Sequence, residues 1–588
     1  MSKSFRIAFI FTGLLALWLS GGFLIRADDA RLETESGARP KIRPEVQPEV
    51  RAIWVDAFRD GVKTPAQIDQ LIQDALTGNI NTLLVQVRRR GDAYYNRSVE
   101  PRTEDPALPP EFDALQYLIE KAHQNHIEVH AWLNTLVAWN SSVPPKDPNH
   151  VWNLHGPQAK GQANWVTYYR NKSGQKWADT LHHSYFLDPG NPDALDYTVA
   201  VYLNIVRNYA VDGIHLDFSR YDGMGFGYNP TNVARYNAVY GTTGLPAPDD
   251  PRWAQWRRDQ TANLVRKIYL KAIALKPNIK VSSAVITWGD GPLTEDDWLK
   301  SRAYNDVFQD WRSWLEEGIL DLAIPMNYFN EWNPTQNLWY NHWIEWEKNH
   351  QYTRQIVIGP AIYTQYIEQS LDQIRRALTP SALGNRPAGV ALYAYAASHV
   401  YSANDFKETW ASRSLPRQPH VYLPETNGWF FGLLTSIGIY TDPVLKTEVT
   451  TQPVFPAPAA PPEMPWKSSP TKGYLMGTIV DPSGRPYDHL KVTVEGWLTV
   501  DPDAATLNPD KVGFHREIYT DGSGWFGLSE LPTGFYRVTV DAACAQDSAQ
   551  GNTHSFDQSP AQTDTQGLSG AKTKEIVVQA GQVTEVDF

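Results

Sequence analysis

Val211-Asp-Gly-Ile-His-Leu-Asp-Phe-Ser-Arg-Tyr-Asp222 is the segment from which the architecture of this chain can be inferred. Apolar residues at positions 214, 216 and 218 alternate with polar ones at 215, 217 and 219, which is the period of a β-strand with two different faces. A buried imidazole and carboxylate cost free energy unless they serve a purpose. Polar residues at the C-terminal ends of parallel barrel strands line the functional face. Asp217 is therefore the first candidate for a functional residue.

The strand pattern recurs between residue 50 and about residue 410. Amphipathic helical patterns, such as Pro65–Leu76 and Leu195–Tyr209, separate most of the repeats, and Thr64 before Pro65 is a suitable N-cap. Eight strands that alternate with helices predict a (β/α)8 TIM barrel over residues 50–412. An open doubly wound sheet is the alternative, but the count of eight and the lack of a glycine-rich phosphate turn favour the barrel. The eight predicted strands are Arg51–Ala57, Thr82–Arg88, Glu128–Asn134, Gly213–Phe218, Lys280–Ile286, Leu320–Tyr328, Gln355–Tyr363 and Gly389–Ala396.

Composition narrows the classes of partner. The chain has 588 residues, too many for one compact core, so two or more domains are expected. Its formal net charge of -12 argues against nucleic acid as a partner. The single cysteine, Cys544, excludes an internal disulfide framework. The 22 tryptophans and 29 tyrosines include flat rings that suit the faces of sugars, although most will serve the core.

The N-terminus has the pattern of a targeting segment. Lys3 and Arg6 precede an uncharged, mostly apolar run over residues 7–25. Residues 1–26 are therefore expected to be a signal peptide or a signal anchor, and residues 27–49 a flexible spacer. The run is close to the length that spans a bilayer, so cleavage and retention both stay open. Export to the periplasm, cell envelope or exterior is expected, with membrane attachment only through an uncleaved anchor.

The periodicity of the barrel ends near residue 410. Residues 413–450 contain apolar stretches and are expected to pack on the barrel, and the proline-rich residues 451–472 are expected to form an extended, semi-rigid linker. Short alternating strands separated by turn residues then predict a small all-β sandwich over residues 473–588. Within it, the polar residues 543–570 are expected to form a long mobile insertion.

Acidic, polar and aromatic side chains collect at the C-terminal ends of the predicted barrel strands. Such a collection suits a saccharide site, and the histidines lack the further His or Cys that would complete a metal site. No metal or other cofactor is therefore expected. The candidate residues are Trp54 and Asp56 on the first strand, Gln86 and Arg88 on the second, His130, Trp132 and Asn134 on the third, His215, Asp217, Arg220 and Tyr221 on the fourth, Asn327, Tyr328 and Glu331 on the sixth, Tyr363 on the seventh and Tyr395 on the eighth.

Several of these motifs, in the same order, resemble glycosyl-hydrolase-like family 10, also called the YngK-like family. The residues that carry the resemblance over positions 50–410 are Arg51-Ala-Ile-Trp-Val55, Asn81-Thr-Leu-Leu-Val-Gln-Val-Arg88, His130-Ala-Trp-Leu-Asn134, Asp212-Gly-Ile-His-Leu-Asp217 with Arg220-Tyr221, and Pro325-Met-Asn-Tyr328. The resemblance implies a secreted or periplasmic enzyme that acts on glycans, with cell-wall glycan strands among the substrates. Asp222 departs from the pattern, because proline commonly follows the Arg-Tyr pair.

The C-terminal region is similar to a different family. The segments Gly477-Thr-Ile-Val-Asp-Pro-Ser-Gly-Arg-Pro486 and Thr520-Asp-Gly-Ser-Gly-Trp-Phe526 resemble carboxypeptidase regulatory-like domains. That resemblance implies a spacer or adhesion module without chemistry of its own.

Glycoside cleavage usually needs two carboxyl groups. Asp217 is one candidate, while Glu331, Asp56 and Asp290 all fall near strand ends and could supply the second. Asp56 could instead be a structural acid paired with Arg88. The fourth strand also resembles the Asp-Gly-x-Asp-x-Asp-x-Glu pattern of family 18 chitinases, but His215 replaces an Asp and Ser219 stands where the catalytic Glu would be. This mismatch argues against transfer of the substrate-assisted chitinase mechanism.

The protonation state of Asp217 is expected to depend on Arg88 and His215. Burial against Trp132 would raise the pKa of Asp217 and suit an acid, whereas a nearby cation would lower this pKa and suit a nucleophile.

Two functions follow from these features. The first is an exported glycoside hydrolase that cleaves O-glycosidic bonds in a cell-envelope or extracellular polysaccharide, with peptidoglycan strands as a candidate. The alternative is a catalytically inactive saccharide-binding envelope protein.

Overall fold

The computed structural model describes residues 47–171, 176–177, 184–398, 424–441, 448–497, 513–541 and 571–588. The predicted targeting segment 1–26, nearly all of the spacer 27–49 and the predicted insertion 543–570 lie outside these residues. Among the helices of the described part, none combines the length and apolarity needed to cross a membrane.

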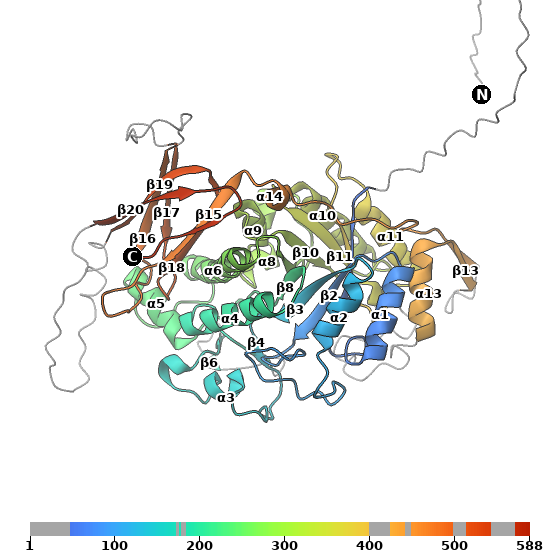
Figure 1. Ribbon diagram of the computed structural model, residues 1–588, viewed down its shortest axis with the longest axis horizontal. Coiled ribbons are helices and arrows are strands. Elements are labelled where there is room, and N and C mark those ends of the chain that lie inside the picture. Colours follow the sequence, from blue (N-terminus) through green and yellow to red (C-terminus); the bar gives the residue numbers. More distant parts are fainter. Residues whose placement is uncertain are drawn as a thin grey trace, which may run out of the picture. The chain divides into compact units, whose positions relative to one another are not determined.

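Eight parallel strands close into a barrel in the order β1-β12-β11-β10-β9-β8-β3-β2 (Figure 1). Each predicted strand overlaps one of them, so the (β/α)8 barrel is confirmed and the open sheet is excluded. The strands are β1 (Val50–Val55), β2 (Thr82–Arg88), β3 (Glu128–Asn134), β8 (Gly213–Asp217), β9 (Lys280–Val285), β10 (Leu322–Asn327), β11 (Gln355–Pro360) and β12 (Gly389–Leu392).

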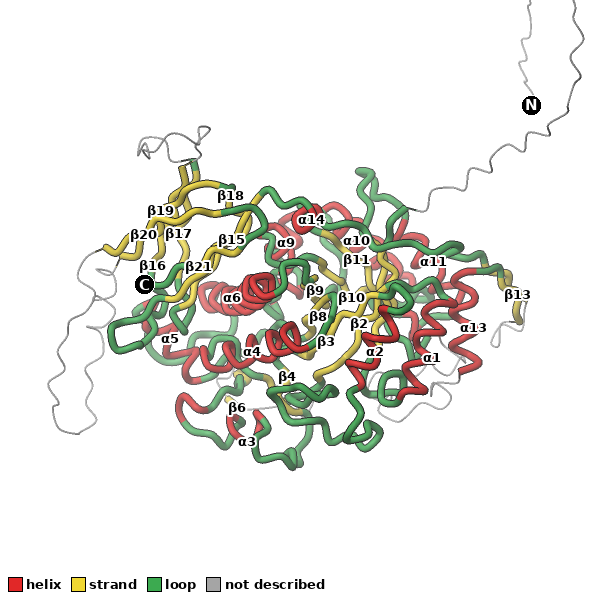
Figure 2. Tube along the Cα trace, in the orientation of Figure 1, coloured by secondary structure: helices red, strands yellow, loops and turns green. Residues whose placement is uncertain are grey.

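Helices surround the barrel strands (Figure 2). Several begin at a proline preceded by a capping residue: Asn191, Asn229, Asp250 and Asn333 each accept a hydrogen bond from a backbone N–H of the first turn. The helices are α1 (Pro65–Thr77), α2 (Ala114–His123), α4 (Pro192–Asn208), α5 (Pro230–Tyr240), α6 (Pro251–Leu275), α7 (Glu295–Trp298), α8 (Arg302–Asn305), α9 (Trp311–Glu317), α10 (Pro334–Asn349) and α11 (Ile367–Leu378), with a 3-10 turn, η2, at Ile362–Thr364.

The longest insertion of the barrel lies between β3 and α4. It contains short elements: β4 (Val137–Trp139), α3 (Val151–His155), the 3-10 turn η1 (Gly161–Ala163), β5 (Tyr169–Arg170), β6 (Lys176–Trp177) and β7 (Tyr185–Phe186). Two antiparallel pairs, β4 with β7 and β5 with β6, hold this insertion together.

The two faces of the barrel strands form separate apolar cores. On β1, Val50, Ala52 and Trp54 belong to the core inside the barrel. Ile53 and Val55 belong to the larger core between strands and helices. This division follows from the two-residue period of a strand, which sends successive side chains to opposite faces.

The C-terminal region is a two-sheet sandwich, as predicted. A three-stranded sheet has the order β18-β15-β21, and a four-stranded sheet has the order β17-β16-β19-β20. Their inner faces share one apolar core. The strands are β15 (Lys472–Thr478), β16 (Lys491–Trp497), β17 (Phe514–Tyr519), β18 (Trp525–Pro532), β19 (Gly534–Asp541), β20 (Ala571–Val578) and β21 (Val583–Glu585).

The described part of the 413–450 segment packs on the barrel. Helix α13 (Pro424–Thr435) lies beside α1 (Figure 1) and contributes the buried side chains of Phe430 and Phe431. Thr435 Oγ1 donates to the carbonyl oxygen of Thr77 at 3.1 Å. A hairpin of β13 (Gly438–Thr441) and β14 (Glu448–Thr451) follows the helix.

The proline-rich residues 452–464, here called the strap, are not a free linker. Backbone Glu49 N donates to Ala460 O at 2.8 Å, and Asn81 Nδ2 donates to Ala459 O at 2.9 Å. The side chain of Met464 joins the core inside the barrel, at the end where the strands begin. The strap therefore closes the N-terminal end of the barrel. It is bound there by hydrogen bonds to the chain around β1 and by the apolar contacts of Met464.

A buried carboxylate fastens the end of the strap. Trp466 Nε1, in α14 (Pro465–Ser468), donates to Asp321 Oδ1 at 2.6 Å, and Lys467 Nζ lies 3.0 Å from Asp321 Oδ2. The same carboxylate also accepts the backbone N–H of Val281 at 2.8 Å. Burial of this anion is tolerated because several donors compensate for the lost water.

Gly213 makes room for a buried histidine inside the barrel. His130 on β3 is paired in register with Gly213 on β8. A Cβ atom added to Gly213 would lie 2.6 Å from His130 Cγ, well inside van der Waals contact. The imidazole of His130 therefore leaves no room for a side chain at position 213.

We expect Gly213→Ala to lower the free energy of unfolding by about 1–3 kcal/mol, the usual cost of overpacking a core. The measurement is chemical denaturation. Gly432→Ala in α13 is the control, because nothing lies within 4 Å of the Cβ position there. The cost should shrink when His130→Ala is added; an unchanged cost in the double variant would contradict the steric explanation.

Candidate active site

Asp217 lies at the C-terminal end of β8, as the sequence predicts. Its carboxyl group accepts the indole N–H of Trp132 at 3.2 Å through Oδ2 and the backbone N–H of Phe218 at 2.8 Å through Oδ1. The residue is only 7% exposed. Phe218 has a φ of 53°, a left-handed conformation that is rare for a bulky residue and that marks the end of the strand as a constrained site.

Burial raises the pKa of the Asp217 carboxyl group from 3.8 to about 6. The positive charge of Arg220 and the hydrogen bonds from Phe218 and Trp132 act in the opposite direction, but burial prevails. Asp217 can therefore hold a proton near neutral pH. The expectation that Arg88 and His215 set its protonation is wrong, since neither contributes to this shift.

His215 is a neutral structural group beneath Asp217. Its Nε2 accepts the indole N–H of Trp54 at 3.0 Å, and its Nδ1 lies 2.9 Å from Ser282 Oγ. An indole can only donate, so Nε2 carries no proton and Nδ1–H donates to Ser282. Burial lowers the pKa of His215 well below its usual value, in agreement with this tautomer. Both ring nitrogens are occupied, so His215 orients Trp54 rather than contacting substrate.

Aromatic side chains surround Asp217. The ring of Tyr328 stacks on Tyr393 with centroids 5.2 Å apart, and Tyr363 meets Tyr393 at 5.6 Å. Trp54 and Trp132 contact the same tyrosine at 5.9 and 6.5 Å. The negative charge of Asp217 contributes to the raised pKa values of both Tyr328 and Tyr393, which places these phenols next to the carboxyl group. Tyr393 is thus the centre of an aromatic wall beside Asp217.

Tyr393 was missed by the sequence analysis, which selected Tyr395. The Tyr395 hydroxyl donates to Asp74 Oδ2 on α1 at 2.8 Å, outside the barrel. Strand β12 ends at Leu392, so the two-residue alternation that brings Ala391 inward continues to Tyr393 but no further. The two-residue alternation of the strand points to position 393, but the sequence pattern does not show where the strand ends.

Arg220 lies in the loop after β8, and its charge acts on Asp217. Its guanidinium lies over the ring of Phe218 at 4.7 Å and over Trp288 at 5.2 Å, and Trp288 was not among the predicted residues. Tyr221, the next residue, is buried instead and donates to Asp188 Oδ1 at 2.9 Å. Tyr221 therefore supports the loop rather than lining the site.

Asp56 lies at the end of β1 and is fully engaged. Its Oδ1 accepts the backbone N–H groups of Phe58 and Arg59 at 2.9 and 3.1 Å, and its Oδ2 accepts Arg59 Nη1 at 2.6 Å. The negative charges of Asp56 and Asp217 both contribute to the raised pKa of Tyr393. The predicted pairing of Asp56 with Arg88 is wrong.

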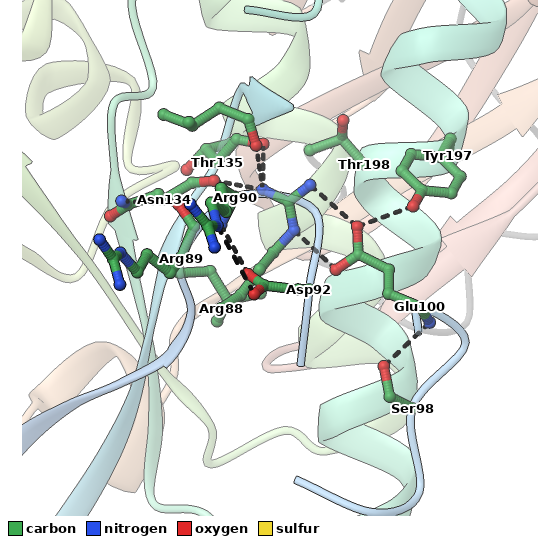
Figure 3. A network of polar contacts seen from close by, with 12 residues as sticks. Arg88, Arg89, Arg90, Asp92, Ser98, Glu100, Asn134, Thr135, Tyr197 and Thr198 are labelled. Atoms are coloured by element: carbon green, nitrogen blue, oxygen red, sulfur yellow. Dashed lines mark hydrogen bonds and ion pairs between the residues drawn. The ribbon is translucent and has the colours of Figure 1, made fainter. Parts of the chain in front are cut away.

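Arg88 belongs to a buried network behind the site (Figure 3). Its guanidinium forms two hydrogen bonds with Glu100, at 2.7 and 2.9 Å, and Glu100 also accepts the hydroxyl of Tyr197 on α4 at 2.7 Å. Arg88 Nη1 donates in addition to the carbonyl oxygens of Asn134 and Val137. A bidentate pair with these extra acceptors is a favourable way to bury an arginine. Arg88 therefore fixes the end of β3 and does not contact substrate.

Gln86 and Asn134 connect the ends of three strands below the site. Gln86 Oε1 accepts the backbone N–H of Ala57 at 3.0 Å, and Gln86 Nε2 donates to Asn134 Oδ1 at 3.0 Å. Both residues are buried. They position β1, β2 and β3 relative to one another.

Two further candidates lie away from the barrel mouth. His130 is buried towards the beginning of β3, with Nε2 3.5 Å from Glu128 Oε2. Asn327 on β10 points outward and donates through Nδ2 to Glu347 Oε2 on α10 at 2.9 Å. The substrate-binding roles predicted for His130 and Asn327 are therefore not supported by their positions.

Glu331 and Asp290 are also held outside the mouth. Glu331 forms an ion pair with Arg376 and accepts Gln373 Nε2 at 3.1 Å, both on α11, and it accepts Asn337 Nδ2 on α10. Asp290 is half exposed and lies 2.8 Å from His342 Nδ1 on α10. The geometry therefore gives Glu331 a structural role and leaves Asp56 as the predicted second carboxyl group at the mouth.

The family model of glycosyl hydrolase-like 10 matches residues 49–373, more than half of the chain. The chain belongs to the glycosyl hydrolase-like 10 family. This result confirms the resemblance carried by the barrel motifs.

Two relatives of this glycosyl hydrolase-like 10 chain are similar at low identity. Glycosyl hydrolase YngK of Bacillus subtilis (strain 168) is 27% identical over 300 residues, covering 48% of this chain and 54% of the relative. Glycosyl hydrolase DigH of Escherichia coli (strain K12) is 28% identical over 283 residues, covering 46% of this chain and 59% of the relative. The chain thus spans between half and three fifths of the length of these relatives.

Among solved structures, the glycoside hydrolase domain of PgaB (BpsB) from Bordetella bronchiseptica is similar with a TM-score of 0.43 and 16% identity. That match covers 59% of this chain and 94% of the domain.

We expect Asp217→Asn to reduce turnover of a glycan substrate by about 10²–10⁴-fold, the usual contribution of a positioned proton donor. Stability should not fall with activity. The folded-state pKa of about 6 lies above the ordinary 3.8, so the ionised group destabilises the fold as pH rises through this window. At pH 8 the Asn variant should therefore equal or exceed the wild-type free energy of unfolding, by up to about 3 kcal/mol. The gain should vanish near pH 3.5; a variant that is inactive because it is unfolded would contradict the assignment.

We expect Glu331→Gln to keep activity within about threefold while lowering the free energy of unfolding by about 1–2 kcal/mol, because it loses the charged hydrogen bond to Arg376. Asp290→Asn is the matched control and should change neither quantity. The measurements are turnover and chemical denaturation. A loss of activity of 100-fold or more in a stable Glu331→Gln protein would return Glu331 to the mechanism.

Proposed function

We propose that this chain is an exported glycoside hydrolase that cleaves O-glycosidic bonds in a cell-envelope or extracellular polysaccharide. The observation that carries the proposal is the Asp217 carboxyl group, buried in an aromatic wall with a pKa of about 6. An acid of this strength is partly protonated near neutral pH and can donate to the oxygen of a leaving sugar. The aromatic rings beside it provide flat apolar surfaces for the faces of a pyranose.

Asp56 is the second carboxylate that we propose. Its charge acts on the same tyrosine as that of Asp217, and the contact with Arg59 suits a group that acts as an anion, either as a base or as a nucleophile. The separation of the two carboxyl groups in the substrate complex determines the stereochemistry: about 5 Å for retention and about 6.5–9.5 Å for inversion. Arg220, over Trp288, follows Asp217 in the chain and can bind a polar substituent of the substrate.

The substrate and the destination of the chain are finer parts of the proposal. Peptidoglycan glycan strands are the first candidate substrate, on the basis of the family resemblance. The basic and then apolar residues 1–26 support export. We assign the C-terminal sandwich to the carboxypeptidase regulatory-like type and propose that it acts as a spacer or adhesion module.

One observation favours the alternative of an inactive saccharide-binding protein. Both carboxylate oxygens of Asp56 already accept hydrogen bonds from its own turn and from Arg59, which leaves the group with little freedom to act on substrate. A panel of glycans, including peptidoglycan strands with and without stem peptides, separates the two functions when the products are analysed by mass. New reducing ends establish hydrolysis, and binding without products establishes the alternative.

The acid role of Asp217 can be tested with substrates of different leaving groups. Asp217→Asn should spare glycosides with an activated phenolate leaving group, which need no protonation, far more than natural glycans. The measurement is kcat/KM for both substrate types.

Equal loss on both substrate types would contradict the acid role and make Asp217 the nucleophile. In that case azide should restore turnover in an Asp217→Gly variant with altered product stereochemistry.

A further inference from the structure

A cleft lies between the barrel and the C-terminal sandwich and is lined by residues of both. Its volume is about 620 Å³, and it is bounded by α6 of the barrel and by β17 and β18 of the sandwich. Figure 1 shows α6 next to β18, and the two elements are in contact. Ligand sites in proteins commonly measure about 300–1,000 Å³. No residue of the aromatic wall around Asp217 lines this cleft.

The walls of this α6 cleft are fastened to each other. Lys267 Nζ on α6 lies 2.9 Å from Asp521 Oδ2 and 2.6 Å from Ser523 Oγ, and the side chains of Lys267 and Asp521 are almost completely buried. Arg235 on α5 forms a bidentate pair with Asp488 at 2.6 and 2.8 Å. The cleft is therefore preformed, and a ligand would not have to order its walls on binding.

Aromatic rings line the α6 cleft. The imidazole of His489 stacks on Tyr519 with centroids 4.5 Å apart and planes 10° apart, and Trp256 on α6 lies 6.1 Å from the same imidazole. Tyr519 is 48% exposed even though one face of its ring is covered by His489. Its uncovered surface is a flat platform of the kind that packs on the apolar face of a pyranose.

Residues with hydrogen-bonding groups line the α6 cleft. The indole N–H of Trp525 is buried and has no acceptor among the described residues. Arg516 donates to the carbonyl oxygen of His515 at 3.0 Å, and no carboxylate of the described chain pairs with it. Asp259 is solvent-exposed, and its Oδ1 accepts Gln255 Nε2 at 2.8 Å. Donors and acceptors thus face the same space.

The charges of the α6 cleft indicate which ligand it fits. Its lining contains four Lys or Arg side chains and four Asp or Glu side chains, so it has no excess of either sign. A polyanion or a polycation would meet as much repulsion as attraction there. A neutral ligand with many hydroxyl groups and an apolar face satisfies both the rings and the polar groups.

We propose that the α6 cleft is a second saccharide-binding site, which holds a neutral segment of a polysaccharide. This proposal goes beyond the hydrolysis proposed for the barrel mouth, because binding of a polysaccharide at the cleft requires no turnover. The sandwich then contributes to polymer recognition by completing a cleft on α6.

The test is affinity electrophoresis of the full chain carrying Asp217→Asn, which prevents consumption of the polymer. The gels contain glycol chitin, hydroxyethyl cellulose, galactomannan or dextran as neutral probes, and polygalacturonate as an anionic probe. Two variants alter the cleft from opposite walls: Tyr519→Ala removes the platform, and Ala262→Trp fills the space from α6. Phe535→Ala on β19 is the control, because Phe535 is 46% exposed, like Tyr519, but does not line the cleft.

We expect at least one neutral polymer to retard the chain, and both cleft variants to weaken its apparent Kd by about tenfold, the effect of truncating a central aromatic contact. Phe535→Ala should stay within twofold of the parent. Equal retardation of all variants, or no retardation by any neutral polymer, would overturn the proposal. Tyr519→Ala is a surface change, so it decides the question even if Ala262→Trp fails to fold.

The failure of this proposal can be told apart from failure of the proposed function. The cleft variants are also made with Asp217 intact and assayed on short oligosaccharides. Unchanged turnover is expected, since short substrates reach only the barrel mouth. Binding at the cleft with no turnover in any variant would contradict hydrolysis while leaving the second site intact.

Discussion

Burial of the Asp217 carboxyl group is the constraint on which the rest of the site depends. The indole of Trp132 and the backbone of Phe218 supply donors that make burial tolerable without abolishing the raised pKa. Beneath it, His215 must be neutral, since a second buried charge would be costly, and it is kept neutral by Trp54 and Ser282. Asp217 can therefore keep its proton near neutral pH, because burial outweighs the charge of Arg220 and the hydrogen bonds that favour its ionised form.

The polar groups around this interior have mainly positioning roles. The ion pair of Arg88 with Glu100 holds the end of β3, and the ion pair of Arg376 with Glu331 joins the loop after β10 to α11. Each pair is compensated by additional hydrogen bonds, as buried or partly buried charges require. A carboxylate held in such an ion pair keeps its negative charge and is a poor proton donor. A position near a strand end is therefore not sufficient to identify a catalytic acid.

The strap and the sandwich extend the barrel at sites remote from the mouth. Asp321 binds both Trp466 and Lys467, so the chain crosses the N-terminal end of the barrel before it enters the sandwich. The sandwich then packs against α6 through Lys267 and Asp521. These contacts give the proline-rich segment a structural role that its composition, typical of linkers, does not indicate.

The sequence by itself determined the eight strands, the sandwich and Asp217, because strand period and polar strand ends are local properties that survive in one dimension. The sequence predicted only part of the aromatic wall. Tyr328 and Tyr363 were predicted correctly, but Tyr395 was predicted where Tyr393 lies. Only the tertiary structure decided that Arg88 pairs with Glu100 and that Glu331 faces α11. These outcomes depend on where each strand ends and on partners far away in the chain, and a side chain near a strand end turns inward or outward according to that packing.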